Sequence, residues 1–429
     1  MSSPSRIFVT DCEGPLTRND NAMEIAARFL PWGGEFFARL SRYDDYLADV
    51  VRKPGYNAGD TLSLIAPFFV AFGLRDSDVQ AFSADNVLLV PGAAEMLAEM
   101  QKLMPSFIIS TSYTPYIRAL CDVMRFPFDN CRCTEMALNA WAMDEAEKVW
   151  LRDWLQRIVQ RPVIQIPAEA SVLADLSADD RASVRELDGL FWDEMSAAGH
   201  LSGEILAAVR PVGGGMKLAA LEGIVADLDV RGEDVMYVGD SITDAPPFAA
   251  VRQWGGVSLS FNGNGYALAA AQYAAASADT RPTLELARAF VAGGSAAVAA
   301  AVDEWPSEHE APRPPGDEPG APALPQVGAI DEAGDGLASA SAWARTHVRG
   351  EPIARLADDA DSGQRRRAGL VARRSRRLVL GLPLAHGLGD GRAAAGDEGA
   401  RQLEGRHRVG AGGGVLRRRQ RVPVAVETQ

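Results

Sequence analysis

Several residue types on which whole classes of protein depend are scarce in this chain of 429 residues. Its four cysteines are too few for the disulfide framework of a small secreted domain. Four of its five histidines lie beyond residue 305, leaving only His200 before that point, which disfavours a histidine-based catalytic triad. No apolar run reaches the length of a membrane span, and the polar start of the chain is unlike a signal peptide. We therefore expect a cytoplasmic protein without a membrane partner.

Positive charge is also scarce, because the formal net charge is −14 and only four residues are lysine. The acidic excess lies in residues 1–305, whereas the remainder is slightly basic. An acidic surface argues against nonspecific binding of nucleic acid. It does not prevent phosphate binding, because Mg²⁺ and a lysine can reverse the field inside one cleft. We expect a small-molecule partner and no nucleic acid, and the composition does not indicate the oligomeric state.

The last part of the chain differs in composition from the rest. From Pro306 onward there is no Phe, Tyr, Cys, Met or Lys, and Trp343 is the one tryptophan. A segment dominated by Pro, Gly, Ala and Arg buries too little apolar surface to offset chain entropy. We predict that residues 304–429 form a disordered tail, or are the out-of-frame translation of GC-rich DNA. An arm that binds RNA or acidic partners is a third interpretation.

The first apolar strand of the chain ends in acidic residues. The run from Arg6 to Thr10 is typical of a buried strand, and it leads directly into Asp11-Cys12-Glu13-Gly14-Pro15. Two carboxylates followed by Gly and Pro indicate a sharp turn at the end of the strand. Because ligands of open α/β sheets bind at the carboxyl ends of the strands, these acids predict a site for a metal ion and a nucleophile.

Three later segments carry polar side chains that fit the same site. Ser110 ends the apolar run that starts at Ser106, and Thr111 follows it. Lys217 comes after three glycines and opens an amphipathic stretch. A third apolar run ends in Gly239 and leads to Asp240 and Asp244. Together with the Asp11 loop these segments make four groups, three of which lie at strand ends, so we expect them to meet at one edge of the sheet.

Taken in chain order, these motifs resemble those of the haloacid dehalogenase (HAD) superfamily of phosphohydrolases. The family has a D-x-D loop, a Ser or Thr after the second motif strand, a Lys, and a GD-x-x-x-D motif, and the resemblance covers roughly residues 5 to 290. It implies an α/β fold with a Rossmann-like parallel sheet and an Mg²⁺ ion. The Asp-Cys-Glu-Gly-Pro loop also resembles a HAD subgroup associated with energy-converting hydrogenase, which implies no substrate.

The resemblance implies a role for each motif residue. Asp11 would attack phosphorus and form an aspartyl-phosphate, while Lys217 and Mg²⁺ neutralise the charge of the phosphoryl oxygens. Ser110, which we expect to end the strand, would donate a hydrogen bond to the phosphate, with Thr111 and Ser112 as competing donors. The backbone N–H of Thr111 could add a further hydrogen bond. The metal site would comprise Asp11, Glu13 through its carbonyl group, Asp240 and Asp244. Asp244 would hold either Lys217 or a metal-bound water.

Two residues depart from the family pattern. Glu13 stands where the family usually has the Asp that serves as general acid and base. The carbonyl contact to the metal is unaffected by this change, and we expect Glu13 to carry the proton with altered geometry. Pro15 replaces a Thr and stiffens the loop.

The spacing between the motifs predicts two helical inserts. Helical patterns over 22–30, 34–49 and 61–72 indicate a cap at residues 18–85, inserted after the first strand. Patterns over 139–160 and 182–198 indicate a second insert at residues 136–204, either a further cap element or an oligomerisation surface. The core would then comprise residues 1–17, 86–135 and 205–303.

We predict a Mg²⁺-dependent phosphohydrolase that acts on a small phosphorylated metabolite. In the phosphoserine-phosphatase-like branch of the family a carboxylate near the entry to the cap contacts the substrate amine. Asp20 and Glu24 are therefore candidates to meet a cationic part of the substrate. The alternatives are a phosphotransferase or mutase with the same intermediate, and a HAD-like partner subunit with weak or no turnover.

Overall fold

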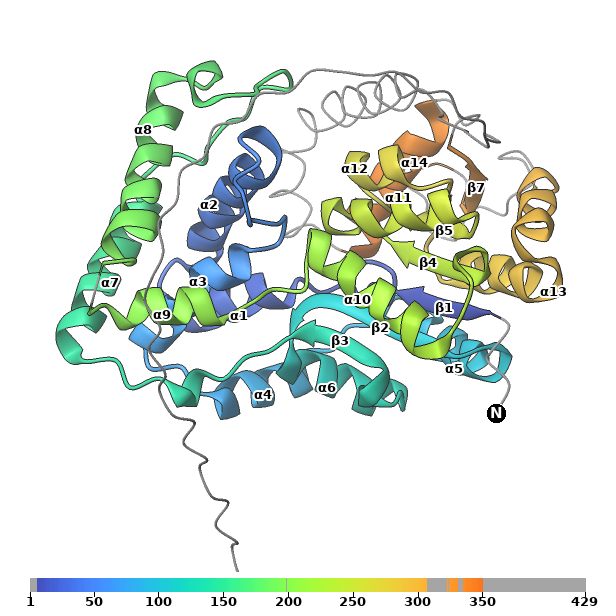
Figure 1. Cartoon of the computed structure of the whole chain (residues 1–429), viewed down its shortest axis with the longest axis horizontal. Coiled ribbons are helices and arrows are strands. Elements are labelled where there is room, and N and C mark those ends of the chain that lie inside the picture. The colour runs from blue at the N-terminus through green and yellow to red at the C-terminus, as the bar shows by residue number, and fades with distance from the viewer. Residues whose placement is uncertain (1–5, 198, 307–321, 323, 331–334, 350–429) are drawn as a thin grey trace, which may run out of the picture. The chain divides into compact units, whose positions relative to one another are not determined.

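The computed structural model describes residues 6–197, 199–306, 322, 324–330 and 335–349. Its centre is a sheet with helices around it (Figure 1). The sheet has seven strands in the order β3-β2-β1-β4-β5-β6-β7, and among them only the β6–β7 pair is antiparallel. This sheet confirms the predicted α/β fold class. The strands are β1 (Ile7–Thr10), β2 (Ser106–Tyr113), β3 (Cys131–Thr134), β4 (Val235–Gly239), β5 (Val257–Phe261), β6 (Tyr273–Ala276) and β7 (Gln326–Ala329).

Helices cover both faces of the sheet. One face packs on α5, α6 and α13, and the other on α10, α11 and α12. Alternate residues of β1 serve the two faces, with Phe8 on the first and both Ile7 and Val9 on the second. The helices of this layer are α5 (Ala93–Leu103), α6 (Thr114–Met124), α10 (Gly214–Leu228), α11 (Ala245–Trp254), α12 (Gly265–Ala270) and α13 (Arg281–Asp303).

The strand register brings the predicted motifs together. Thr10 of β1 pairs with Val238 of β4, and on the other side with Ile108 of β2. Asp11 and Asp240, which lie just beyond these pairs, therefore leave the sheet at the same edge. A parallel sheet with this register explains why residues more than two hundred positions apart meet.

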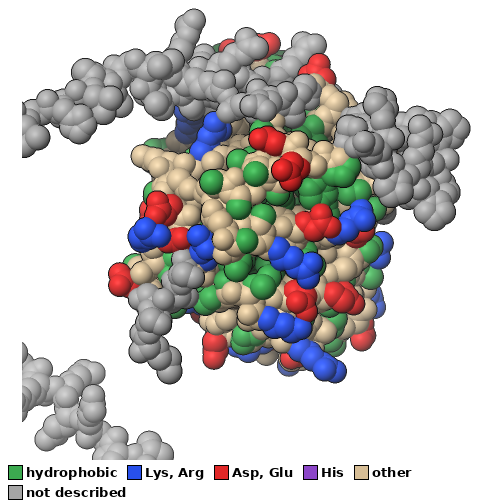
Figure 2. Space-filling model, turned by 90° about the vertical axis from the view of Figure 1, so that its right-hand side faces the viewer, with side chains coloured by type: hydrophobic (Ala, Val, Ile, Leu, Met, Phe, Trp, Pro, Cys, Tyr) green, Lys and Arg blue, Asp and Glu red, His purple; other side chains and the backbone are tan. Residues whose placement is uncertain are grey.

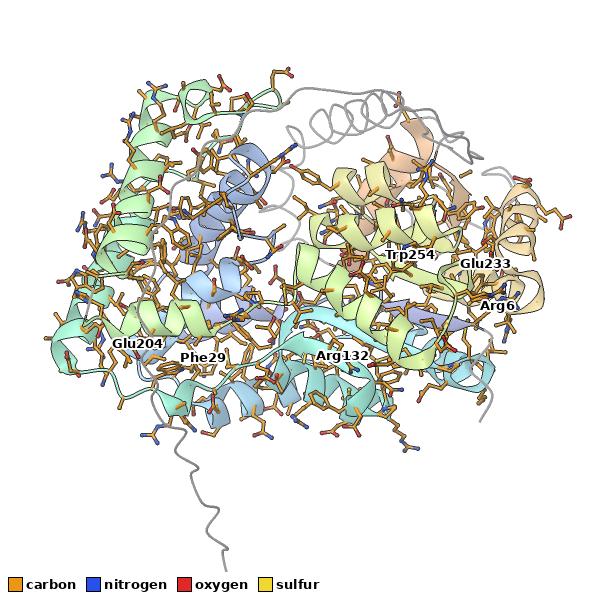
Figure 3. All side chains as sticks on the ribbon, in the orientation of Figure 1. Arg6, Phe29, Arg132, Glu204, Glu233 and Trp254 are labelled. Carbon is orange, nitrogen blue, oxygen red and sulfur yellow. The ribbon has the colours of Figure 1, made fainter. Side chains whose placement is uncertain are left out.

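The two inserts share one hydrophobic core. Phe36 and Phe68 from the first insert lie in the same buried cluster as Leu151 and Phe191 from the second. Within the first insert, Phe29 packs edge-to-face on Phe82 with ring centroids 5.7 Å apart (Figure 3). The second insert thus adds to the cap. The helices are α1 (Asn21–Phe29), α2 (Gly33–Asp45), α3 (Thr61–Ala71), α4 (Asp76–Asp85), α7 (Glu145–Val159), α8 (Ala178–Asp188) and α9 (Leu201–Ala208), with π-helical turns at Tyr46–Val50 and Gly189–Glu194.

The prediction that everything from residue 304 onward lacks stable structure is wrong for two segments. β7 pairs with β6, and α14 (Asp335–Arg349) packs on β6 through Leu337, Ala340 and Ala344. The packing partners on β6 are Ala274 and Ala276, so small side chains on both elements permit a close approach. Composition did not indicate this core because it holds few large apolar residues. The remainder of the predicted tail lies outside the described residues.

Among the described residues, one helix has the length and apolar composition of a membrane span, so the expectation that no apolar run reaches that length is wrong for this segment. It is α13, which is broken at Gly293 and Gly294, where the backbone angles are not helical. Leu286, Phe290 and Val298 of this helix lie in the hydrophobic core. One face of α13 therefore packs in the core beside the sheet. On the face shown in Figure 2, acidic and basic side chains are interspersed, without a field of one sign.

Candidate active site

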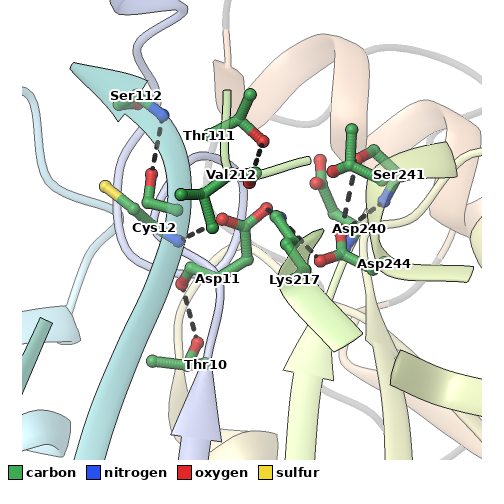
Figure 4. Close-up of polar contacts among 12 residues, drawn as sticks. Thr10, Asp11, Cys12, Thr111, Ser112, Val212, Lys217, Asp240, Ser241 and Asp244 are labelled. Carbon is green, nitrogen blue, oxygen red and sulfur yellow. Dashed lines mark hydrogen bonds and ion pairs between the residues drawn. The ribbon is translucent and has the colours of Figure 1, made fainter. Parts of the chain in front are cut away.

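Asp11 directly follows β1 and is held from both sides. Its backbone N–H donates to the carbonyl oxygen of Val238 at 2.8 Å. Its Oδ1 accepts the Cys12 N–H at 2.7 Å, and its Oδ2 lies 2.7 Å from Lys217 Nζ (Figure 4). Burial raises the pKa of Asp11 to about 8, although the Lys217 charge opposes this shift. A further cation at this point would favour the ionised carboxylate that nucleophilic attack requires.

Lys217 links the first and last motifs. It lies in the first turn of α10 and is fully buried, with Nζ 2.7 Å from Asp11 Oδ2 and 2.8 Å from Asp244 Oδ1. Burial alone lowers the pKa of a lysine, but the two carboxylates outweigh it, so the pKa of Lys217 is raised. Lys217 is therefore an ammonium group that neutralises the candidate nucleophile.

Asp244 is engaged at both of its carboxylate oxygens. Oδ1 accepts from Lys217 Nζ at 2.8 Å and from the Tyr237 hydroxyl at 2.9 Å. Oδ2 accepts the backbone N–H groups of Asp240 at 2.9 Å and Ser241 at 3.1 Å. Burial by itself raises the pKa of Asp244, but Lys217 and these hydrogen bonds outweigh it and hold the pKa below its ordinary value. Asp244 thus anchors Lys217 and the loop that follows β4.

Asp240 is surrounded by the first loop and by α14. A Cβ atom on Gly14 would lie 2.4 Å from Asp240 Oδ2, so a residue with a side chain cannot occupy this turn without displacing the carboxylate. Gly14 also has a φ of +102°, which favours glycine. Arg345 of α14 donates from Nη1 to Asp240 Oδ2 at 2.5 Å. Asp240 therefore joins the first motif, the last motif and the C-terminal helix.

The donor set fits a divalent cation. Asp11, Asp240 and Asp244 each offer a carboxylate oxygen, and these three oxygens lie within 4.8 Å of one another. Hard oxygen donors of this kind suit Mg²⁺. Asp11 and Asp240 line the cavity and Asp244 does not, so Asp11 and Asp240 are the carboxylates better placed to bind the ion.

The predicted phosphate-binding hydroxyls are placed differently from one another. β2 continues to Tyr113, so the prediction that Ser110 ends the strand is wrong. Ser110 is fully buried, and its Oγ accepts the Ser112 N–H at 3.1 Å. Thr111 and Ser112 line the cavity beside Asp11, and Thr111 Oγ1 donates to the Val212 carbonyl oxygen at 3.1 Å. Ser112 Oγ is buried and has no hydrogen-bond partner within the described part of the chain.

A cavity of about 210 Å³ lies between the strand ends and the cap. Glu13 and Asp20 line it. Glu13 Oε1 accepts the Asn21 N–H at 2.7 Å, and Asp20 Oδ1 caps α1 by accepting the Met23 N–H at 3.2 Å. Glu24 does not line the cavity, because its carboxylate accepts hydrogen bonds from Asn19 Nδ2 at 2.8 and 3.0 Å.

Three glycines bring the cap loop onto the start of α10. A Cβ atom on Gly213 would lie 2.3 Å from the Ala58 carbonyl oxygen, and one on Gly215 would lie 2.9 Å from Asn57 Oδ1. Gly214 has a φ of +43°. The glycines before Lys217 therefore permit backbone contact between cap and core beside the candidate site.

Arg345 and Asp44 are among the residues that line the cavity and that sequence reasoning missed. The pattern of Leu337, Ala340 and Ala344 has helical spacing and could have indicated α14. No comparable signal marked Asp44, because an acid on an amphipathic helix ordinarily faces solvent.

The fold and the site together define an α/β protein with a carboxylate–lysine centre at the carboxyl edge of its parallel strands. This arrangement agrees with the resemblance to HAD phosphohydrolases. Three of the four motifs that carry the resemblance meet within one network, in which Asp11, Lys217, Asp244 and Asp240 are successive members.

Comparisons with known proteins were made on sequence and on structure. No family model and no curated protein matches the chain. The gene product AF1437 from Archaeoglobus fulgidus is similar in structure, with 28% sequence identity and a TM-score of 0.64. That similarity covers 81% of this chain and 97% of that chain, and it supports the fold.

Two further solved structures are more distant. Phosphoserine phosphatase in its apo form has 13% identity and a TM-score of 0.39, over 66% of this chain and 98% of that chain. A HAD family hydrolase from Deinococcus radiodurans R1, with bound phosphate and sodium, has 11% identity and a TM-score of 0.24, over 61% and 82%.

Proposed function

We propose that this chain is a Mg²⁺-dependent phosphohydrolase of the HAD type that acts on a small phosphorylated metabolite. The observation that carries the proposal is the contact of one buried lysine with both Asp11 and Asp244, at 2.7 and 2.8 Å. A buried carboxylate at a strand end, with an ammonium group beside it, suits nucleophilic attack on an anionic phosphate. The cavity of about 210 Å³ suits a small substrate.

The chemistry follows from the placement of the acids. A carboxylate oxygen of Asp11 attacks phosphorus, the new O–P bond forms, and the bond to the leaving oxygen breaks. Glu13 lines the cavity and gives its proton to that oxygen. Glu13 then takes a proton from water, which attacks phosphorus, frees Asp11 and releases inorganic phosphate. Asp11, Asp240 and the Glu13 carbonyl would hold Mg²⁺, which when bound neutralises the phosphoryl oxygens.

The remaining groups bind and orient. Ser112 Oγ is buried beside the cavity without a partner among the described residues, so it is placed to donate to a phosphoryl oxygen. Ser110 positions Ser112 by accepting its backbone N–H at 3.1 Å. Asp244 keeps Lys217 in place. The cap excludes water from the transfer step, and Asp20 is placed to meet a cationic part of the substrate.

The test is hydrolysis of p-nitrophenyl phosphate by the intact chain, with and without Mg²⁺. We expect turnover that needs the metal and that falls by at least about a thousandfold in Asp11→Asn, because the nucleophile is lost. Asp122→Asn, a change to an exposed acid on α6, is the matched control and should leave the rate unchanged. Absence of turnover with any divalent metal would refute the hydrolase. Equal turnover in Asp11→Asn would refute the aspartyl-phosphate.

A further inference from the structure

Arg345 reaches the candidate site from α14, far along the chain from every motif residue. The helix is fixed by Leu337, Ala340 and Ala344 against β6, and Ser341 Oγ donates to the Gly263 carbonyl oxygen at 3.1 Å. Arg345 follows Ser341 by one helical turn and therefore projects toward the same loop. Its side chain is 17% exposed and lines the cavity with Asp11.

The guanidinium group is held by one of its nitrogens. Nη1 donates to Asp240 Oδ2 at 2.5 Å, to the Asp240 carbonyl oxygen at 3.2 Å and to the Asn262 carbonyl oxygen at 3.4 Å. Nε and Nη2 have no hydrogen-bond partner in residues 6–349 as far as these are described. A guanidinium group has five N–H donors in a planar fork, so three donors are uncommitted.

The charge balance of the cavity sets Arg345 apart. Arg345 is the one cationic side chain among the described residues that line this cavity. Lys217 is fully buried and does not line the cavity, and its ammonium group pairs with Asp11 and Asp244. A substrate phosphoryl group that enters among so many carboxylates needs further positive charge. A planar guanidinium fork matches the oxygens of a phosphoryl group.

We propose that Arg345 is a phosphoryl-binding residue of this site, supplied by α14. The proposal rests on the proposed function. Nη1 keeps the contact with the main chain after β4 and β5, while Nε and Nη2 donate to oxygens of the phosphoryl group. The helix α14 is then part of the active site.

The test is a calorimetric titration of the intact chain with inorganic phosphate at saturating Mg²⁺. We expect Arg345→Gln to weaken phosphate binding by at least about tenfold, because a charge-assisted contact is lost. Arg345→Lys keeps the positive charge but lacks the planar guanidinium group, so its affinity for phosphate should lie between those of the unaltered chain and Arg345→Gln. His347→Ala, a change to an exposed residue on the same helix, is the matched control and should bind phosphate like the unaltered chain.

Each outcome decides whether Arg345 binds the phosphoryl group or only forms an ion pair with Asp240. Unchanged or tighter phosphate binding in a folded Arg345→Gln variant would overturn the proposal, since Arg345 would then only pair with Asp240. If Arg345→Gln fails to fold, the comparison of Arg345→Lys with His347→Ala decides in the same way. Weakened phosphate binding without any hydrolysis of p-nitrophenyl phosphate would uphold Arg345 and refute the hydrolase, so the two failures are distinguishable.

Discussion

Two buried acids of this protein stand in opposite surroundings. Asp244 has five donor atoms around its oxygens, one of them the Lys217 ammonium nitrogen. Asp44 of α2 is 5% exposed, and its Oδ2 accepts the Gly59 N–H at 2.9 Å, but its Oδ1 has no hydrogen-bond partner within the described residues. The Tyr56 hydroxyl is near enough to influence this carboxyl group, without hydrogen-bond geometry. Burial without a cation is therefore the dominant influence on Asp44.

Asp44 predicts a specific dependence of stability on pH. Burial raises its pKa from 3.8 to about 8, and the charges of Asp45 and Asp60 act in the same direction. Between these values the folded chain keeps the Asp44 proton and the unfolded chain loses it, so this residue's contribution to stability falls as pH rises. We expect the melting temperature of Asp44→Asn, relative to the unaltered chain, to increase from pH 5 to pH 8. A difference that is constant over this range would contradict the assignment.

Lys217 predicts a large loss of stability on substitution. In Lys217→Met two buried carboxylates lose their cation, which costs about 3–5 kcal/mol of the free energy of unfolding. Adding Asp11→Asn should restore part of the loss, because one of the two uncompensated charges is removed. Urea unfolding measures both effects. The control is Lys102→Met, at an exposed surface pair with Glu99, where we expect little change, and an equal loss there would refute the interpretation.

At the scale of elements, the approach of the cap to α10 depends on glycine. In Gly213→Ala the new Cβ would lie 2.3 Å from the Ala58 carbonyl oxygen, which is backbone and cannot move aside cheaply. We expect a loss of about 1–3 kcal/mol of stability, the usual cost of overpacking, together with lower phosphatase activity. Urea unfolding and the p-nitrophenyl phosphate assay test this expectation.

The same helix offers the control. Gly223 lies within α10, and a Cβ atom there would meet nothing within 4 Å. We expect Gly223→Ala to leave activity unchanged and to stabilise the chain by up to about 1 kcal/mol, because alanine has the higher helix propensity. Equal effects of the two substitutions would show that contact with the cap loop is not the cause.

At the scale of the whole molecule, the last described elements complete the sheet. β7 covers the open edge of β6, and Leu324, Leu337 and Ala344 are buried beside it. A chain ending at residue 305 would leave that edge unpaired and that surface exposed. We expect the free energy of unfolding of this chain, measured with urea, to be lower than that of a chain ending at residue 349 by at least about 2 kcal/mol. We also expect it to aggregate more readily. Equal stability of the two chains would contradict this role.

Much of the fold could be predicted from the sequence because its signals are local. The apolar runs before Asp11 and Asp240 mark buried strands, and helical spacing over 61–72 matches α3 at Thr61–Ala71. The motif residues Asp11, Lys217 and Asp240 meet as expected, because parallel strands deliver their carboxyl ends to one edge. These features depend on hydrophobic periodicity and on the order of the motifs along the chain, both of which can be read from the sequence.

Only the tertiary structure decided which side chains complete the site. Arg345 reaches Asp240 because α14 packs on an alanine-rich strand. The residues that neighbour Arg345 in the sequence do not indicate that packing. Ser112 lines the cavity and Ser110 does not, because β2 continues past Ser110 to Tyr113. Cap residues from distant parts of the chain form the other wall of this cavity, so the sequence of the strand alone does not show which serine faces it. Sequence determines which elements form, whereas contacts between elements far apart in the chain determine which of their polar groups are buried, paired or left facing the cavity.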